Sequence, residues 1–140
     1  MWYSSGVQIN PVDKREITEV AKRHGLALVV LFGSQATGHT HKKSDVDIGY
    51  IADRDIDYRE NYNISLELAR IFKNPDVELV NLKNVSPEFK KQVAGTGIVL
   101  YDDASRFDSF SIYAHRIYME TKPLRAYRDF YIKNFLKNYA

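Results

Sequence analysis

The stretch LFGSQATGHTHKKSDVDIGYI, residues 31–51, determines how the rest of the chain is organised. An apolar run ends at Gly33-Ser34, ten residues intervene, and Asp45-Val46-Asp47 opens a second apolar run. The pattern predicts a strand, then a turn in which residues 35–37 begin a helical turn, and then a second strand. The two halves of the stretch carry different chemistry.

The first half suits the binding of an anion. Backbone N–H groups freed at a turn of this kind point outward, and a glycine lets the backbone come close to a phosphate. The second half places Asp45 and Asp47 two residues apart in a strand, so both carboxylates leave the same face. Two such carboxylates repel each other unless a cation lies between them, and their hard oxygen ligands suit Mg²⁺. Together the two halves predict a site for a metal-bound nucleoside triphosphate.

A second motif competes for the same residues. The segment GSQATGHT, residues 33–40, matches the P-loop pattern GxxxxGK[ST] at every position except one, because His39 stands where the pattern has lysine. That lysine carries the charge that reaches the outer phosphates, so its absence removes the main chemistry of the motif. A P-loop also leads into a long helix, whereas residues 40–44 are polar and basic and a strand follows them. The P-loop interpretation is therefore disfavoured.

Length and composition fit one ordinary globular domain of 140 residues. The formal net charge of +2 is too small to indicate a nucleic-acid partner by itself. The chain has no cysteine, which excludes a disulfide scaffold and a thiolate zinc site. Its longest apolar run, residues 26–32, is too short to span a bilayer, and the N-terminus lacks a signal-peptide pattern. We expect a soluble, cytoplasmic protein that binds neither membranes nor nucleic acid directly.

Apolar runs and apolar–polar alternation predict four strands, at residues 27–32, 45–51, 77–82 and 98–101. The first run is continuous, as expected of a strand covered on both faces. One helix is predicted before the first strand, from Asn10 to Gly25. Two more are predicted between later strands, one ending at Asn74-Pro75 and one beginning at Ser86. Residues 52–62 are polar and are predicted to form a loop. This order predicts an α/β (α+β) fold with a small mixed sheet.

The character of the chain changes from residue 104 onward. Aromatic residues at helical spacing predict two helices separated by Pro123, and half of the chain's aromatic residues fall here, mixed with arginines and lysines. Packing on the sheet is one interpretation, because such stripes usually belong to a core. Docking of a partner is the other, because interface cores favour aromatic residues and arginine. We predict a core at residues 1–103 and a helical extension at residues 104–140 that packs on the core and could also dock a partner.

The pattern Gly33-Ser34-x10-Asp45-x-Asp47 resembles that of the DNA polymerase β-like nucleotidyltransferases. The short chain is similar to their minimal branch, the MNT proteins, which act as antitoxins paired with HEPN toxins. The resemblance implies the polymerase β-like fold, ATP as substrate and two Mg²⁺ ions held by Asp45 and Asp47. It also implies a third carboxylate from a neighbouring strand, both metal ligand and base, and the matching position is Glu78. The family usually places aspartate there, and Asp76 shares a face with Glu78 and is the alternative.

Residues of the long connection are assigned by the same resemblance and by backbone chemistry. Gly33 and Ser34 are expected to hold the β- and γ-phosphates, and Lys43 is a candidate to neutralise triphosphate charge. Ser44 is expected to cap a turn, and Lys42 is as well explained by solvation. Two histidines, at positions 39 and 41, lie on a polar loop and are not counted as a metal site.

The resemblance implies transfer of AMP from ATP to a protein hydroxyl, a tyrosine of a cognate HEPN ribonuclease toxin, so that the modification silences the toxin. Two alternatives remain open. One is a non-catalytic antitoxin that neutralises the toxin by binding alone, which the departure at Glu78 favours. The other is nucleotidyl transfer to a small molecule such as an aminoglycoside.

Overall fold

The computed structural model describes residues 10–33, 36 and 45–139. Four strands form one sheet: β1 (Leu26–Phe32), β2 (Val46–Ala52), β3 (Val77–Asn81) and β4 (Ile98–Asp102). The helices are α1 (Pro11–His24), α3 (Tyr58–Phe72), α4 (Pro87–Thr96), α5 (Arg106–Glu120) and α6 (Lys122–Tyr139), with a 3₁₀ turn η1 (Leu82–Asn84) after β3. No helix in these ranges is both long enough and apolar enough to span a bilayer.

The sheet is mixed, as the sequence predicts, with the strand order β3-β2-β1-β4. Strand β1 runs antiparallel to both of its neighbours, whereas β2 and β3 are parallel. The apolar run of β1 is covered on both faces. Val29 and Leu31 lie in one buried cluster, and Leu28 and Val30 lie in a second cluster on the other face.

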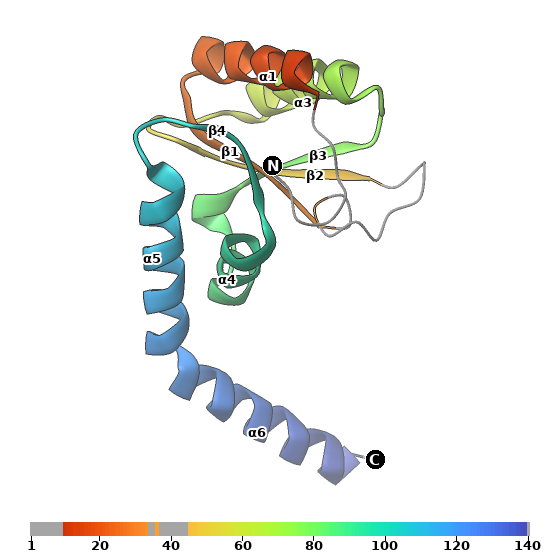
Figure 1. Ribbon diagram of the computed structural model, residues 1–140. Helices are drawn as coiled ribbons and strands as arrows, with labels where there is room; N and C mark the ends of the chain where they lie inside the picture. Colours follow the sequence, from red (N-terminus) through yellow and green to blue (C-terminus); the bar gives the residue numbers. More distant parts are fainter. Residues whose placement is uncertain (1–9, 34–35, 37–44, 140) are drawn as a thin grey trace.

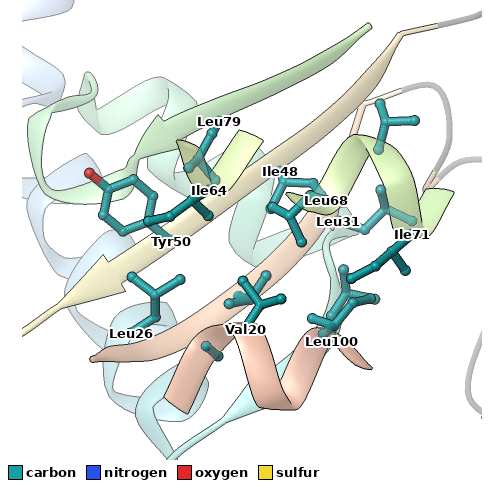
Figure 2. Close-up of a cluster of buried hydrophobic side chains, with 14 of the residues drawn as sticks. Val20, Leu26, Leu31, Ile48, Tyr50, Ile64, Leu68, Ile71, Leu79 and Leu100 are labelled. Carbon is teal, nitrogen blue, oxygen red and sulfur yellow. The ribbon is translucent and has the colours of Figure 1, made fainter. Parts of the chain in front are cut away.

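Helices cover the two faces of the sheet unequally (Figure 1). Helices α1 and α3 lie side by side over one face, and Figure 2 shows the large cluster beneath them, including Val20, Ile64 and Leu68. Helix α4 and part of α5 pack on the opposite face, where Val93 and Phe110 are buried. A three-layer arrangement of this kind buries the central strand and leaves the ends of the sheet available for a site.

Helix boundaries follow from local chemistry at each end. Helix α1 ends at His24, directly before Gly25, which has a positive φ of 69°. The Ser86 side chain accepts a hydrogen bond from the Phe89 N–H at 3.1 Å, as predicted for the start of α4. The prediction of a loop through residue 62 was wrong, because α3 begins at Tyr58. Asp57 caps this helix by accepting a hydrogen bond from the Glu60 N–H at 2.8 Å. The polar first turn of α3 carries no apolar spacing that would have revealed it.

The two C-terminal helices differ in their packing. Helix α5 buries Phe110 and Ala114, whereas α6 has no buried residue and extends away from the sheet (Figure 1). The expectation that both helices pack on the core is therefore met by α5 and is wrong for α6. Its aromatic residues could not meet the core because α6 leaves α5 at a corner and points outward. The division of the chain at residue 103 stays a prediction.

Candidate active site

Asp47 lies between two other predicted site residues on neighbouring strands. In the ladders, Phe32 pairs with Asp47 across β1 and β2, and Asp47 pairs with Glu78 across β2 and β3. Because paired residues on adjacent strands project from the same face, the two carboxylates point to the same side of the sheet. That side is the α4 side, since the alternating residues Ile48 and Leu79 enter the cluster beneath α1 and α3.

A pocket of about 350 Å³ opens at this position, and Asp47 and Glu78 both line it. The remaining lining residues are Phe32, Val80 and Phe89. The rings of Phe32 and Phe89 meet edge to face with centroids 5.3 Å apart. One side of the pocket is thus acidic and another is apolar. Ligand sites commonly combine apolar walls with a few polar or charged groups that orient the ligand.

Gly33 follows β1 directly and lies against the Asp47 side chain. Its φ is +75°, and a Cβ added here would lie 3.2 Å from the Asp47 Cγ and closer still to a carboxylate oxygen. A side chain at position 33 would therefore both strain the backbone and collide with the carboxylate. The Ala36 N–H donates to the Gly33 carbonyl at 3.1 Å, and Ala36 is helical and buried. This geometry agrees with the predicted turn into a helical segment.

The electrostatics of Asp47 reflect the acidic surroundings. Burial raises the pKa of this carboxyl, and the negative charges of Glu78 and Asp45 raise the pKa further. A carboxylate whose ionised form is disfavoured in this way gains most when a cation comes close. Asp45 is exposed directly before β2, near enough for its charge to act on Asp47. The structure thus brings the three predicted carboxylates into one electrostatic cluster.

These carboxylates could bind a metal ion only together with ligands from outside the described residues, such as substrate phosphates and water. Within residues 10–33, 36 and 45–139, no three acidic or histidine side chains converge closely enough to hold an ion alone. Magnesium is usually bound by one or two carboxylates together with substrate phosphates and water, so a pair such as Asp47 and Glu78 suits it. The carboxylates of Asp47 and Glu78, paired on neighbouring strands and lining one pocket, favour a cation there.

Other predicted site residues fall elsewhere. Asp76 is exposed and does not line the pocket, and its carbonyl accepts a hydrogen bond from the Val46 N–H at 2.9 Å, so its backbone starts the β2–β3 pairing. Ser34 and Lys43 lie outside the described residues. Sequence reasoning missed the apolar wall, because Phe32, Val80 and Phe89 look like ordinary core positions in three separate elements.

Comparison with known proteins gives the family. Residues 15–106 match the family described as polymerase beta, nucleotidyltransferase. Over 115 residues the chain is 30% identical to the protein adenylyltransferase MntA of Shewanella oneidensis, and the aligned region covers 82% of this chain and 80% of that protein. The family match over residues 15–106 includes the four strands and the three carboxylates described above.

Solved structures share the fold. A crystal structure of a toxin–antitoxin with AMP-PNP matches with a TM-score of 0.72 and 26% identity, over 88% of this chain and 98% of that chain. A structure of a tri-AMPylated Shewanella oneidensis HEPN toxin in complex with an MNT antitoxin matches with a TM-score of 0.67 and 24% identity, over 89% of this chain and 97% of the other. From its sequence match, its fold and the acidic pocket beside a glycine turn, this chain belongs to the polymerase beta-like nucleotidyltransferase family and is a homologue of the MntA antitoxins.

Proposed function

We propose that this chain is a protein adenylyltransferase that transfers AMP from ATP to a cognate HEPN toxin and so acts as its antitoxin. The chain is similar to a protein adenylyltransferase over most of both lengths, and two of the predicted carboxylates, Asp47 and Glu78, line one pocket. The observation that carries the proposal is the pairing of Asp47 with Glu78 across parallel strands, directly beside Gly33.

Each pocket residue takes a distinct role in this proposal. Asp45 and Asp47 would hold two Mg²⁺ ions, with Glu78 as a third ligand. When bound, the ions would supply positive charge that stabilises the leaving pyrophosphate. Gly33 and Ser34 would bind the β- and γ-phosphates, and Lys43 would add positive charge. The apolar wall of Phe32 and Phe89 keeps water away from one side of the pocket.

Glu78 also takes the proton in the transfer step. The acceptor is a tyrosine hydroxyl of the toxin, and its oxygen attacks the α-phosphorus of ATP. As the new P–O bond forms and the bond to pyrophosphate breaks, the hydroxyl proton moves to a Glu78 carboxylate oxygen. The glutamate side chain is one methylene longer than the aspartate usual in the family, and this length places the carboxylate farther from the strand than an aspartate would reach.

Labelling of the partner with ATP tests the proposal. Full-length protein, HEPN toxin, Mg²⁺ and ATP labelled at the α-phosphate are incubated, and label on the toxin is measured. Asp45→Asn combined with Asp47→Asn removes two metal ligands and should lower the initial rate at least about 100-fold. The matched control combines Asp55→Asn with Asp103→Asn, two exposed aspartates away from the pocket, and should label at the wild-type rate. Equal labelling by the first variant and the wild type would exclude the enzymatic function.

Neutralisation by binding alone is the second candidate, favoured by the exposed helix α6 and by glutamate at position 78. Rescue of toxin-expressing cells separates the two functions. Under the catalytic proposal the Asp45→Asn and Asp47→Asn double variant still binds the toxin and no longer rescues growth. Full rescue by that variant would mean that occlusion suffices.

A further inference from the structure

Helix α6 presents a continuous line of exposed aromatic and apolar side chains. We call this line the α6 stripe, and its members recur every three or four residues along one side of the helix: Leu124, Tyr127, Tyr131, Phe135 and Tyr139. Their exposed fractions run from 51% to 77%, although residues of these types are usually much more buried. The rings of Tyr127 and Tyr131 stack at 6.3 Å, and those of Phe135 and Tyr139 lie 4.6 Å apart, so the stripe is preformed.

The direction of α6 is fixed at its first turns. The Arg125 guanidinium donates to the Thr121 Oγ1 at 2.7 Å and to the Tyr118 carbonyl at 2.8 Å. It also lies over the Tyr118 ring, 3.7 Å from the centroid, and the Lys91 ammonium of α4 lies over the same ring at 4.1 Å. These contacts tie the α5–α6 corner to α4. Helix α6 therefore projects in a fixed direction. A partner that binds this helix does not have to offset the entropy cost of ordering it.

Helix α6 carries much more positive than negative charge. Its residues include five basic side chains and one acidic one, Asp129. Lys122, Lys133 and Lys137 lie on the side opposite the stripe, given 3.6 residues per turn, whereas Arg128 lies on the same side as the stripe. The Arg128 Nη1 is 3.4 Å from the Glu88 Oε2 of α4, and Lys133 and Lys137 lie farther out along the helix. A surface that takes up the stripe and approaches this basic helix therefore gains from negative charge.

We infer that the α6 stripe inserts into an apolar groove of the toxin whose rim carries carboxylates. The inference rests on the proposed function, which supplies the partner, and it names the surface by which that partner is held. Three of the five stripe residues are tyrosines, which together with arginine are enriched among the residues that dominate protein–protein affinity. A tyrosine ring in a groove buries its apolar body while the hydroxyl finds a hydrogen-bond partner at the rim.

The charge pattern argues against the other occupants. Pairing of two α6 helices from two copies would bring two strongly basic segments together, which costs free energy. Helices that lie on membranes usually carry Leu, Phe or Trp on one buried face. In α6, three of the five stripe residues are tyrosines, and the further exposed apolar residues Phe130, Ile132 and Leu136 lie off the stripe. An apolar groove on the toxin takes up the stripe, and carboxylates at its rim attract the net positive charge of the helix.

A binding experiment with the full-length chain tests this surface. Affinity for the HEPN toxin is measured by calorimetry for the wild type and for Tyr127→Ala combined with Tyr131→Ala. If both tyrosines are dominant contacts, the dissociation constant should rise at least about 30-fold. The matched control is Tyr58→Ala combined with Tyr62→Ala, an exposed tyrosine pair at the same spacing on α3, which should leave the affinity unchanged.

Charge and alternative occupants are tested in the same assay. Lys133→Glu combined with Lys137→Glu should weaken toxin binding about tenfold at low salt and reduce its salt dependence. Unchanged affinity in both the tyrosine and the lysine variants would overturn the inference. So would concentration-dependent dimerisation of the wild type, or its binding to phosphatidylserine vesicles, if the tyrosine substitutions abolished it and left toxin binding intact.

The outcome separates the docking surface from the catalytic function. Failure of the docking inference leaves toxin affinity unchanged in the tyrosine variant, while the Asp45→Asn and Asp47→Asn variant still loses labelling. Failure of the proposed function shows the reverse, because a chain without transferase activity can still bind through α6. In the tyrosine variant, Mg²⁺ and ATP should raise the midpoint of thermal unfolding as in the wild type, since the pocket is untouched.

Discussion

At the scale of single residues, Gly33 carries two constraints at once, a positive φ and a close approach to the Asp47 carboxylate. Gly33→Ala should therefore lower the free energy of unfolding by about 1–2 kcal/mol from backbone strain alone. Displacement of Asp47 should also lower the labelling rate at least about tenfold. Thermal unfolding and the toxin-labelling assay measure the two effects.

Gly95 provides the internal control for that substitution. It lies in helix α4, is exposed, and has open space where a Cβ would be added. Gly95→Ala should stabilise the protein by about 0.5–1 kcal/mol, because alanine loses less conformational freedom in a helix. A destabilised Gly95→Ala variant, or a Gly33→Ala variant as stable and active as the wild type, would contradict this account of the two glycines.

Asp47 should show a conflict between stability and function. Its pKa in the folded protein is raised above the ordinary aspartate value of 3.8, so the fold loses stability as the pH rises from that value through the folded pKa. Asp47→Asn removes this loss and should raise the unfolding midpoint by a few degrees at pH 7, by roughly 2–4 °C for each kcal/mol recovered. The gain should vanish when the pH falls below 3.8.

Magnesium should reverse the effect at Asp47. In the wild type, Mg²⁺ with a non-hydrolysable ATP analogue should raise the unfolding midpoint, because the cation offsets the repulsion from Glu78 and Asp45. In Asp47→Asn the increase should be much smaller, and a chelator should remove it from the wild type. If the unfolding midpoint of Asp47→Asn were below that of the wild type at neutral pH, the ionised Asp47 carboxylate would not destabilise the fold.

Single residues were predictable where the chemistry is local. Gly33 and the two aspartates follow from the turn and from period-two spacing, and their roles in a site stay a prediction. Burial and the charges of Glu78 and Asp45 raise the pKa of Asp47. Glu78 was identified from the family pattern and lies opposite Asp47 in the ladder. The apolar wall could not be predicted, because Phe32 and Phe89 meet only through the packing of α4 on the sheet.

At the scale of elements, α1 and α3 are joined by an ion cluster at their exposed edge. His24, at the end of α1, contacts Glu60 at 3.1 Å through Nδ1 and Glu67 at 2.6 Å through Nε2, both on α3. Arg54 also pairs with Glu60, and Arg23 pairs with Glu67. These groups align the two helices over the large cluster beneath them, which the sequence did not suggest because the partners are about 40 residues apart.

The pH dependence of this cluster can be predicted. Hydrogen bonds from Arg54 and His24 lower the pKa of Glu60 to about 2 from the ordinary glutamate value of 4.5. The lowered pKa contributes stability at every pH above 4.5, and this contribution is lost as the pH falls through the folded value. Glu60→Gln should therefore lower the unfolding midpoint at pH 7, and the difference should shrink steadily below pH 4.5.

A control glutamate separates this effect from a general change of charge. Glu19 is an exposed glutamate of α1, and Glu19→Gln should leave the midpoint within about 1 °C of the wild type at all pH values, as surface substitutions usually do. If Glu60→Gln were as stable as the wild type at pH 7, the cluster would not hold the two helices together.

At the scale of the whole molecule, the predicted boundary at residue 103 can be tested against a later one at residue 121. Helix α5 buries Phe110 and Ala114, whereas α6 buries nothing. Removal of residues 122–140 should shift the unfolding midpoint by only a few degrees. Removal of residues 104–140 exposes the core at Phe110, where loss of a phenylalanine side chain alone costs about 3–5 kcal/mol.

The result decides where the folded unit ends. If the shorter chain, residues 1–103, is as stable as the full protein, the predicted boundary is right and α5 is dispensable. The overall fold was otherwise largely predictable, because the strands and caps are encoded locally. The outward direction of α6 was not, since it depends on the contacts of Arg125 at the corner.

The placement of Glu78 has a consequence for how the chain can vary. Strand neighbours alternate in direction, so the burial of Leu79 under α3 obliges Glu78 to emerge on the opposite side, next to Asp47. A shift of β3 by one position would bury a charge and expose a leucine, and the hydrophobic interior resists that exchange. The apolar contacts of Leu79 therefore hold Glu78 and Asp47 in alignment, although Leu79 lies on the opposite face of the sheet. A substitution that loosens the packing of Leu79 should lower the labelling rate strongly while the protein still folds.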